Sequence, residues 1–222
     1  MNRIVFWVFK VGFIGALLAS CSTDRGAASS PAPEMIFGNP EYRAVSYGGY
    51  RGLSRKDGPT VEQLIDDVKI MGAMDIKLLR TYNTSQFPQA ERLLQAIREV
   101  KSEDPSFEMY VMLGAWIESK NAWAEAVWNP ETNAWVEGTG PDHTQGNVEN
   151  NSQEIATAIR LANEYPDIVK AIAVGNEAMV QWAVTYFVYP KTILKWVNHL
   201  QAAKASGALT PDVWITSSDN YE

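Results

Sequence analysis

The sequence predicts an α/β fold of the (β/α)8 barrel type, and three observations lead to this class. Five short apolar runs alternate with segments whose apolar residues recur at helical spacing, a pattern typical of a parallel sheet. No glycine-rich phosphate-binding loop follows the first run. Polar or aromatic residues stand at the end of all five runs, as at the catalytic edge of a barrel. An open, doubly wound sheet of five strands is the alternative.

The strands are expected at 44–47, 76–83, about 109–117, 168–177 and 213–216. The first helix is expected to begin at Thr60, which could form a capping box with Gln63, and Gly207 is expected to stop the last helix. A barrel needs eight strands to close, so the predicted barrel is truncated after the fifth strand.

A long polar segment, 119–150, separates the third strand from its helix and carries Trp123, Trp128 and Trp135. So long a connection in a compact domain is usually functional. Each tryptophan could either pack in a core or bind a ligand, and the sequence leaves both roles open.

The N-terminus has the features of an export signal. Arg3 and Lys10 supply positive charge before a short apolar run from Val11 to Leu18. Leu18-Ala19-Ser20-Cys21, at its end, resembles the lipobox of bacterial lipoproteins. We therefore expect a signal peptide at 1–20 and a lipid on Cys21, which would anchor the protein to the membrane of the cell envelope, at the outer membrane or cell surface. Residues 21–39, rich in Ser, Ala, Gly and Pro, are expected to form a flexible tether, followed by the barrel portion at 40–222.

The composition limits the classes of partner and cofactor expected for this chain. The chain of 222 residues has a net charge of −7, which becomes −9 when 1–20 is removed with Arg3 and Lys10, so nucleic acid is disfavoured. Cys21 is the single cysteine, which excludes a disulfide within the chain. His143 and His199 are the only histidines, and we expect neither a metal nor another cofactor.

The most informative strand end is Gly175-Asn176-Glu177, where a buried apolar run stops at a glycine and two polar residues. Carboxylates beside aromatic side chains suit sugar hydrolysis, which needs a proton donor for the leaving oxygen and a second carboxylate. The candidates expected at this edge are Tyr47, Arg80, Tyr82, Trp116, Glu118, Asn176, Glu177, Trp182, Asp219 and Glu222.

Four motifs resemble glycoside hydrolase family 17, the β-1,3-glucanases, and especially its bacterial members. They are Ser46-Tyr47-Gly48, Leu79-Arg80-Thr81-Tyr82-Asn83, Leu113-Gly114-Ala115-Trp116-Ile117 and Ala173-Val174-Gly175-Asn176-Glu177. Their order and spacing cover most of residues 44–222.

The resemblance implies that Glu177 is the general acid/base and that Asn176 bonds a sugar hydroxyl. Arg80 would lie near the nucleophile, and Tyr47, Tyr82 and Trp116 would line the sugar site; Trp182, in the aromatic connection after the fourth strand, is a further substrate-binding candidate.

The family's nucleophile is a Glu on the seventh strand, whereas five strands are predicted here. The resemblance therefore implies the N-terminal part of a retaining β-1,3-glucan hydrolase or transglycosylase. A non-catalytic glucan-binding surface lipoprotein, and another carbohydrate-active barrel with a different nucleophile, are the alternatives.

Overall fold

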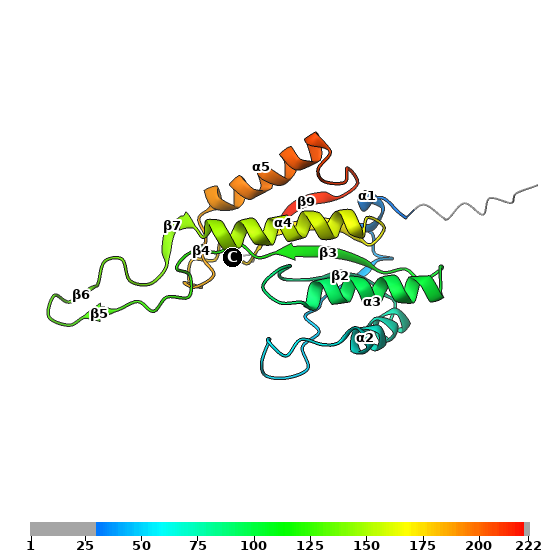
Figure 1. The fold of residues 1–222 in the computed structure, drawn as a ribbon, viewed down its shortest axis with the longest axis horizontal. Helices are drawn as coiled ribbons and strands as arrows, with labels where there is room; N and C mark the ends of the chain where they lie inside the picture. The colour runs from blue at the N-terminus through cyan, green and yellow to red at the C-terminus, as the bar shows by residue number, and fades with distance from the viewer. Residues whose placement is uncertain (1–29, 220–222) are drawn as a thin grey trace, which may run out of the picture.

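A computed structural model describes residues 30–219. Its centre is a parallel sheet of β1 (Arg43–Ser46), β2 (Ile76–Arg80), β3 (Tyr110–Ala115), β8 (Val169–Asn176) and β9 (Trp214–Ser218), in that order (Figure 1). Successive strands are joined through α2 (Val61–Ala73), α3 (Gln89–Glu103), α4 (Val148–Glu164) and α5 (Pro190–Ser206). Two small antiparallel ribbons, β4 (Ser119–Lys120) with β7 (Asp142–Gly146) and β5 (Trp128–Asn129) with β6 (Ala134–Trp135), interrupt the connection between β3 and α4.

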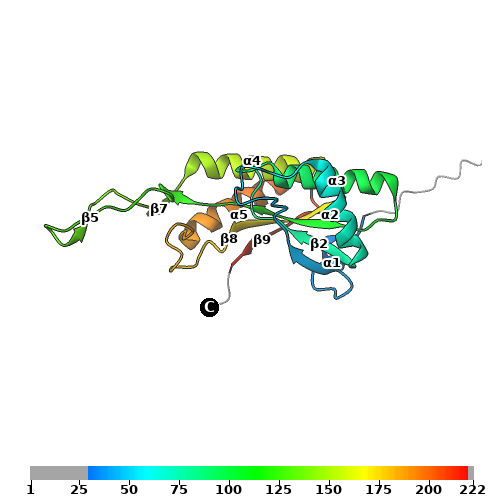
Figure 2. The same ribbon diagram turned by 90° about the horizontal axis from the view of Figure 1, so that it is seen from below.

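The strand order decides between the two predicted architectures. Each strand of the sheet pairs in parallel with the one before it, so the order never reverses. A doubly wound sheet requires such a reversal, whereas a (β/α)8 barrel is wound in one direction. Figure 2 shows α3 and α4 together on one side of the sheet. The fold is therefore the first five strands of a barrel, as the sequence predicts.

The core lies between the sheet and its helices. Leu79, Leu113 and Ile172 point from the strands into this layer and are buried against apolar residues of α3 and α4. β8, in the middle of the layer, is buried along its length up to Asn176, which explains its nearly continuous apolar sequence. In contrast, all four residues of the edge strand β1 are exposed.

The local signals for helices are confirmed. Thr60 and Gln63 form the predicted capping box at the start of α2. Gly207 ends α5 in the left-handed conformation with a φ of 79°, which glycine adopts without steric cost. α4 begins at Val148, earlier than predicted, because the Asn147 side chain caps the helix by accepting a hydrogen bond from the backbone of Asn150 at 3.2 Å.

The fold also begins before the predicted boundary at residue 40. α1 (Pro33–Ile36) lies within the segment predicted as a tether, and Ile36 is only 1% exposed. Ile36 packs with Leu78 and Tyr110, and the ring of Phe37 stacks on Trp214 at 5.4 Å. Two consecutive large apolar residues therefore fix a segment whose Pro, Ala and Ser content is typical of a linker.

Candidate active site

The Gly175-Asn176-Glu177 segment forms a strained turn at the C-terminal end of β8. Gly175 has a φ of 80°, and Glu177 has a φ of 50°, which is uncommon for a residue with a side chain. The backbone N–H of Glu177 donates to the carbonyl of Ser218 at 2.9 Å, so the end of β9 holds the turn in place. Backbone strain of this kind, of order 1–3 kcal/mol, is concentrated at functional sites. Glu177 as a residue is half-buried.

The structure brings Arg80 and Asn176 together. Arg80 Nη2 donates to Asn176 Oδ1 at 2.6 Å, although the two residues come from β2 and β8, with β3 between them. The guanidinium group of Arg80 also lies 5.8 Å from the centre of the Tyr82 ring, within the range of a cation–π contact. Three of the predicted site residues therefore form one connected group beside Glu177.

Gly114 allows the ends of β2 and β3 to pack closely together. A Cβ at this position would lie 2.2 Å from the backbone carbonyl oxygen of Thr81, so only glycine fits. The Gly114 N–H also donates to Thr81 Oγ1 at 3.0 Å, which joins the ends of β2 and β3.

Trp116 is the centre of an aromatic cluster after β3. Its ring lies nearly parallel to Trp123, with centroids 6.5 Å apart, and the ring of Tyr186 meets both edge-on. The indole Nε1 of Trp116 is buried without a hydrogen-bond partner. Trp116 also lines two hollows, of about 260 and 320 Å³. An indole that lines a hollow offers an apolar face to a sugar ring.

Tyr47 lines a small hollow together with Tyr82, while its hydroxyl is engaged by α2. Its hydroxyl hydrogen-bonds the carboxylate of Asp67 on α2, and Arg51 Nη2 binds the same Asp67 oxygen at 2.7 Å. Burial, and then the contact with Asp67, raise the pKa of Tyr47. The hydroxyl of Tyr47 is thus directed to the helix layer, and only its ring lies with Tyr82 at the wall of a small hollow. Trp182 is exposed in the connection between β8 and α5.

Glu118 has a structural role at this edge. It is 5% exposed and accepts three hydrogen bonds, from Trp123 Nε1 at 3.0 Å, Asn147 Nδ2 at 2.8 Å and Asn150 Nδ2 at 2.6 Å. These bonds hold Trp123 and the start of α4 against the end of β3. With both carboxylate oxygens engaged in this way, Glu118 is not placed to act as a nucleophile.

Glu154 is a buried carboxylate that sequence reasoning missed. It lies on α4, is 3% exposed, and accepts hydrogen bonds from the backbone N–H groups of Thr84, Ser85 at 2.8 Å and Trp116 at 3.0 Å. The Ser85 hydroxyl donates to it as well. Glu154 thereby fixes the segments after β2 and β3, which carry Tyr82 and Trp116. Its position next to the apolar Ile155 face of the helix was the available signal, since a buried Glu needs partners.

Asp219 supports the turn from the last described position, because its Oδ2 accepts the backbone N–H of Met179 at 2.9 Å. Glu222 and Cys21 lie outside the described residues. Within 30–219, no group of three or more His, Cys, Asp and Glu side chains could hold a metal ion. No helix in that same range is long and apolar enough to cross a membrane.

Three features lie at the C-terminal edge of the barrel strands: a carboxylic acid on a strained turn, an amide bound to a guanidinium group, and a cluster of indoles. Together they define a carbohydrate-active barrel. A solved endo-laminarinase from Formosa Hel1_33_131 matches 86% of this chain, with 53% identity and a TM-score of 0.76. This match supports the resemblance of the chain to the β-1,3-glucanases of glycoside hydrolase family 17.

The match covers 44% of the laminarinase chain, so this chain spans less than half the length of that relative. CJP38, a β-1,3-glucanase and pollen allergen of Cryptomeria japonica, matches 79% of this chain and 42% of its own, with 16% identity and a TM-score of 0.43. No protein-family model matches the sequence, and no curated protein matches it.

Proposed function

We propose that this chain carries the acid/base half of the active site of a retaining glycoside hydrolase that acts on β-1,3-glucan. The observation that carries the proposal is the placement of Glu177 on a strained turn beside the Arg80–Asn176 pair. The identity of 53% with an endo-laminarinase supports β-1,3-glucan as the substrate class.

Each residue of the group has a chemical role in this proposal. Glu177 protonates the glycosidic oxygen as the bond breaks and later removes a proton from the attacking water. Asn176 Oδ1 already accepts from Arg80, so its Nδ2 is the atom turned to a sugar hydroxyl. Arg80 keeps further N–H donors, which can bind the carboxylate that attacks the anomeric carbon.

None of the described carboxylates near the turn is assigned the role of that second carboxylate, and Asp219 among them accepts the backbone N–H of Met179 at 2.9 Å. A retaining mechanism needs the second carboxylate at about 5 Å from the acid. Glu118 and Glu154 are each held by three or more hydrogen bonds. The family resemblance assigns the nucleophile to the seventh barrel strand, and the sheet described here contains five. We therefore assign to this chain substrate binding and proton transfer, with bond cleavage dependent on the second carboxylate.

The test uses a chimeric protein, called the extended chain, in which residues 30–219 are followed by the part of the laminarinase chain that comes after the matched region. We expect this extended chain to release reducing sugar from laminarin and not from a β-1,4-glucan of similar length. An extended chain that folds, binds laminarin and shows no hydrolysis would favour the second candidate, a non-catalytic glucan-binding protein. The aromatic cluster around Trp116, which lies entirely within this chain, favours that candidate.

We also propose that Cys21 carries a lipid anchor on the cell envelope, as its lipobox implies. Ser30 Oγ donates to the carbonyl of Asp167, just before β8, whereas Glu177 follows the other end of this eight-residue strand. At about 3.3 Å per residue, the two ends lie about 25 Å apart.

The Cys21→Ala variant is expected to leave the membrane fraction or to stop at the precursor stage, because the acceptor of the lipid is removed. Membrane fractionation of the cells and the mass of the mature N-terminus measure this. A Ser20→Ala variant, which keeps the cysteine, serves as the control. If the wild-type protein fractionated as soluble and began at another residue, the proposal of a lipid anchor on Cys21 would be wrong.

A further inference from the structure

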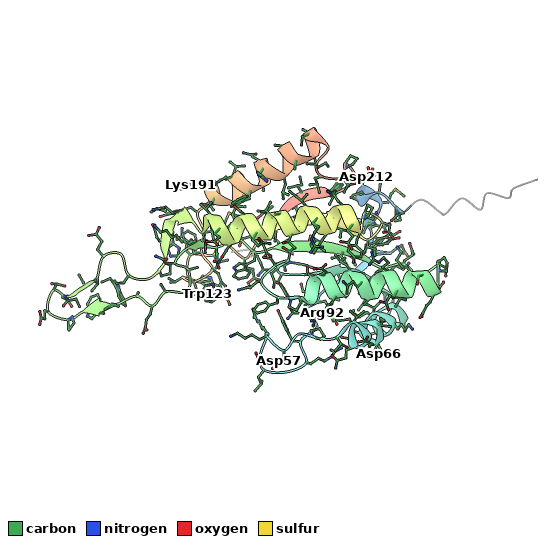
Figure 3. The ribbon with its side chains drawn as sticks, viewed as in Figure 1. Asp57, Asp66, Arg92, Trp123, Lys191 and Asp212 are labelled. Atoms are coloured by element: carbon green, nitrogen blue, oxygen red, sulfur yellow. The ribbon has the colours of Figure 1, made fainter. Side chains whose placement is uncertain are left out.

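The connection between β3 and α4 contains an extended arm, residues 121–141, that the proposed chemistry does not use. The β4–β7 ribbon forms its base and the β5–β6 ribbon its tip. Figure 1 shows the tip far from the sheet and helices, on the side where β3 ends. Figure 3 places Trp123 where the arm leaves the body of the fold. An isolated two-stranded ribbon is marginally stable, so its length calls for a function.

The tip of the arm exposes large apolar side chains. Trp128 and Trp135 are 44% and 64% exposed, lie directly opposite each other in the ribbon, and have ring centroids 5.1 Å apart at 76°. Val127 and Val136, which adjoin them, are exposed as well. Single exposed apolar residues are ordinary, but four together on a ribbon mark a binding surface.

The aromatic surface continues toward the active edge. Trp123, at the base of the arm, is exposed and is held by the hydrogen bond from its Nε1 to Glu118. Its ring lies nearly parallel to that of Trp116, which lines two hollows after the end of β3. Aromatic faces therefore occur at the site, at the base of the arm and at its tip.

The charge of the arm selects the kind of ligand. Residues 121–141 contain Glu125, Glu131 and Glu137 and neither Lys nor Arg. An acidic arm repels nucleic acid, anionic polysaccharide and anionic lipid. The negative faces of indole rings attract the C–H groups of a neutral sugar ring, and this contact requires no cation.

We propose that the arm is a second glucan-binding site, which contacts the same polysaccharide chain as the Glu177 site at a distance from it. This inference rests on the proposed function and extends it, because it makes long glucan chains the preferred ligand. Trp128 lies eight residues after Lys120, and Figure 1 shows the tip of the arm well away from the strand ends that carry the Glu177 site. A disaccharide or trisaccharide bound beside Glu177 does not bridge this separation, whereas a polymer does.

The test compares the 222-residue protein with its Trp128→Val/Trp135→Val variant. Valine favours β structure, so the ribbon is retained while both flat rings are removed. Affinity is measured by titration with long-chain laminarin and with laminaritriose. We expect the double variant to bind laminarin about tenfold more weakly and laminaritriose as wild type does. Ile70→Ala, which removes an exposed apolar side chain on α2, serves as the matched control.

Each outcome distinguishes the two proposals. If the double variant and the wild type bound laminarin with equal affinity, the proposal that the arm binds glucan would be wrong, and the proposed function would stand. If the affinity for laminarin and the affinity for laminaritriose fell equally, the substitutions would disturb the main site. The proposal that the arm binds glucan would then also be wrong. A wild type that binds neither glucan would overturn both proposals. If thermal melting shows that the double variant is unfolded, the single Trp135→Val variant carries the same comparison.

Discussion

Glu177→Gln in the extended chain is expected to lower laminarin hydrolysis by about 10²–10⁴-fold, the usual contribution of general acid catalysis. The amide keeps the shape and hydrogen-bonding capacity of the side chain but cannot transfer a proton to the glycosidic oxygen. Because the turn is held by the backbone bond from Glu177 to Ser218, the substitution should not disturb it. The rate of reducing-sugar release, with laminarin affinity measured in parallel, tests this expectation.

An aryl β-glucoside with an acidic leaving group separates a catalytic loss from a structural one. Such a leaving group departs without protonation, so the first step should survive in the Glu177→Gln variant while the second step, which needs a base, becomes slow. We expect a burst of the released aryl alcohol followed by a slow steady state. Equal losses on laminarin and on the aryl glucoside, without a burst, would remove Glu177 from the acid role.

Glu154→Ala is expected to have the largest effect on stability. The substitution leaves the N–H groups of Thr84, Ser85 and Trp116 without their acceptor, in a region where Glu154 itself is 3% exposed. Thr84 is buried and Trp116 is partly buried, whereas Ser85 is exposed and its N–H can bond water. An unsatisfied buried donor costs about 1–3 kcal/mol. We therefore expect the free energy of unfolding to fall by about 3–5 kcal/mol, measured by urea denaturation.

Glu164→Ala on the same helix is the matched control. Glu164 pairs with Arg160 at 3.2 Å on the exposed side of α4, and surface ion pairs of this kind contribute about 0–1 kcal/mol. If Glu154→Ala and Glu164→Ala destabilised the protein equally, the hydrogen-bonding role assigned to Glu154 would be wrong.

The sequence predicted the alternating architecture because apolar periodicity is read locally. The parallel strands, the capping box at Thr60 and the end of α5 at Gly207 all depend on neighbouring residues, and all are confirmed. α1 was missed because its order depends on Leu78, Tyr110 and Trp214, which are distant in the sequence. The ribbons of the arm were missed because β4, β5 and β6 have two residues each, and the five residues of β7 contain no apolar alternation.

The candidate site was predicted in part for the same reason. The Asn176–Glu177 and Arg80 motifs lie at strand ends, and a parallel sheet brings such ends to one edge, so their proximity followed from the fold. The orientation of a side chain does not follow from its place in a motif. Tyr47 turns to Asp67, and Glu118 is enclosed by Trp123, Asn147 and Asn150.

In this account Glu177 is the acid/base, and none of the described residues 30–219 is the second carboxylate of a retaining hydrolase. The most direct test measures reducing-sugar release from laminarin by the 222-residue chain, by its Glu177→Gln variant and by the extended chain, at equal concentrations. We predict turnover by the extended chain alone, with both short chains at the level of the blank. Turnover by the 222-residue chain that disappears in Glu177→Gln would contradict the claim, since it would place a nucleophile within the residues present.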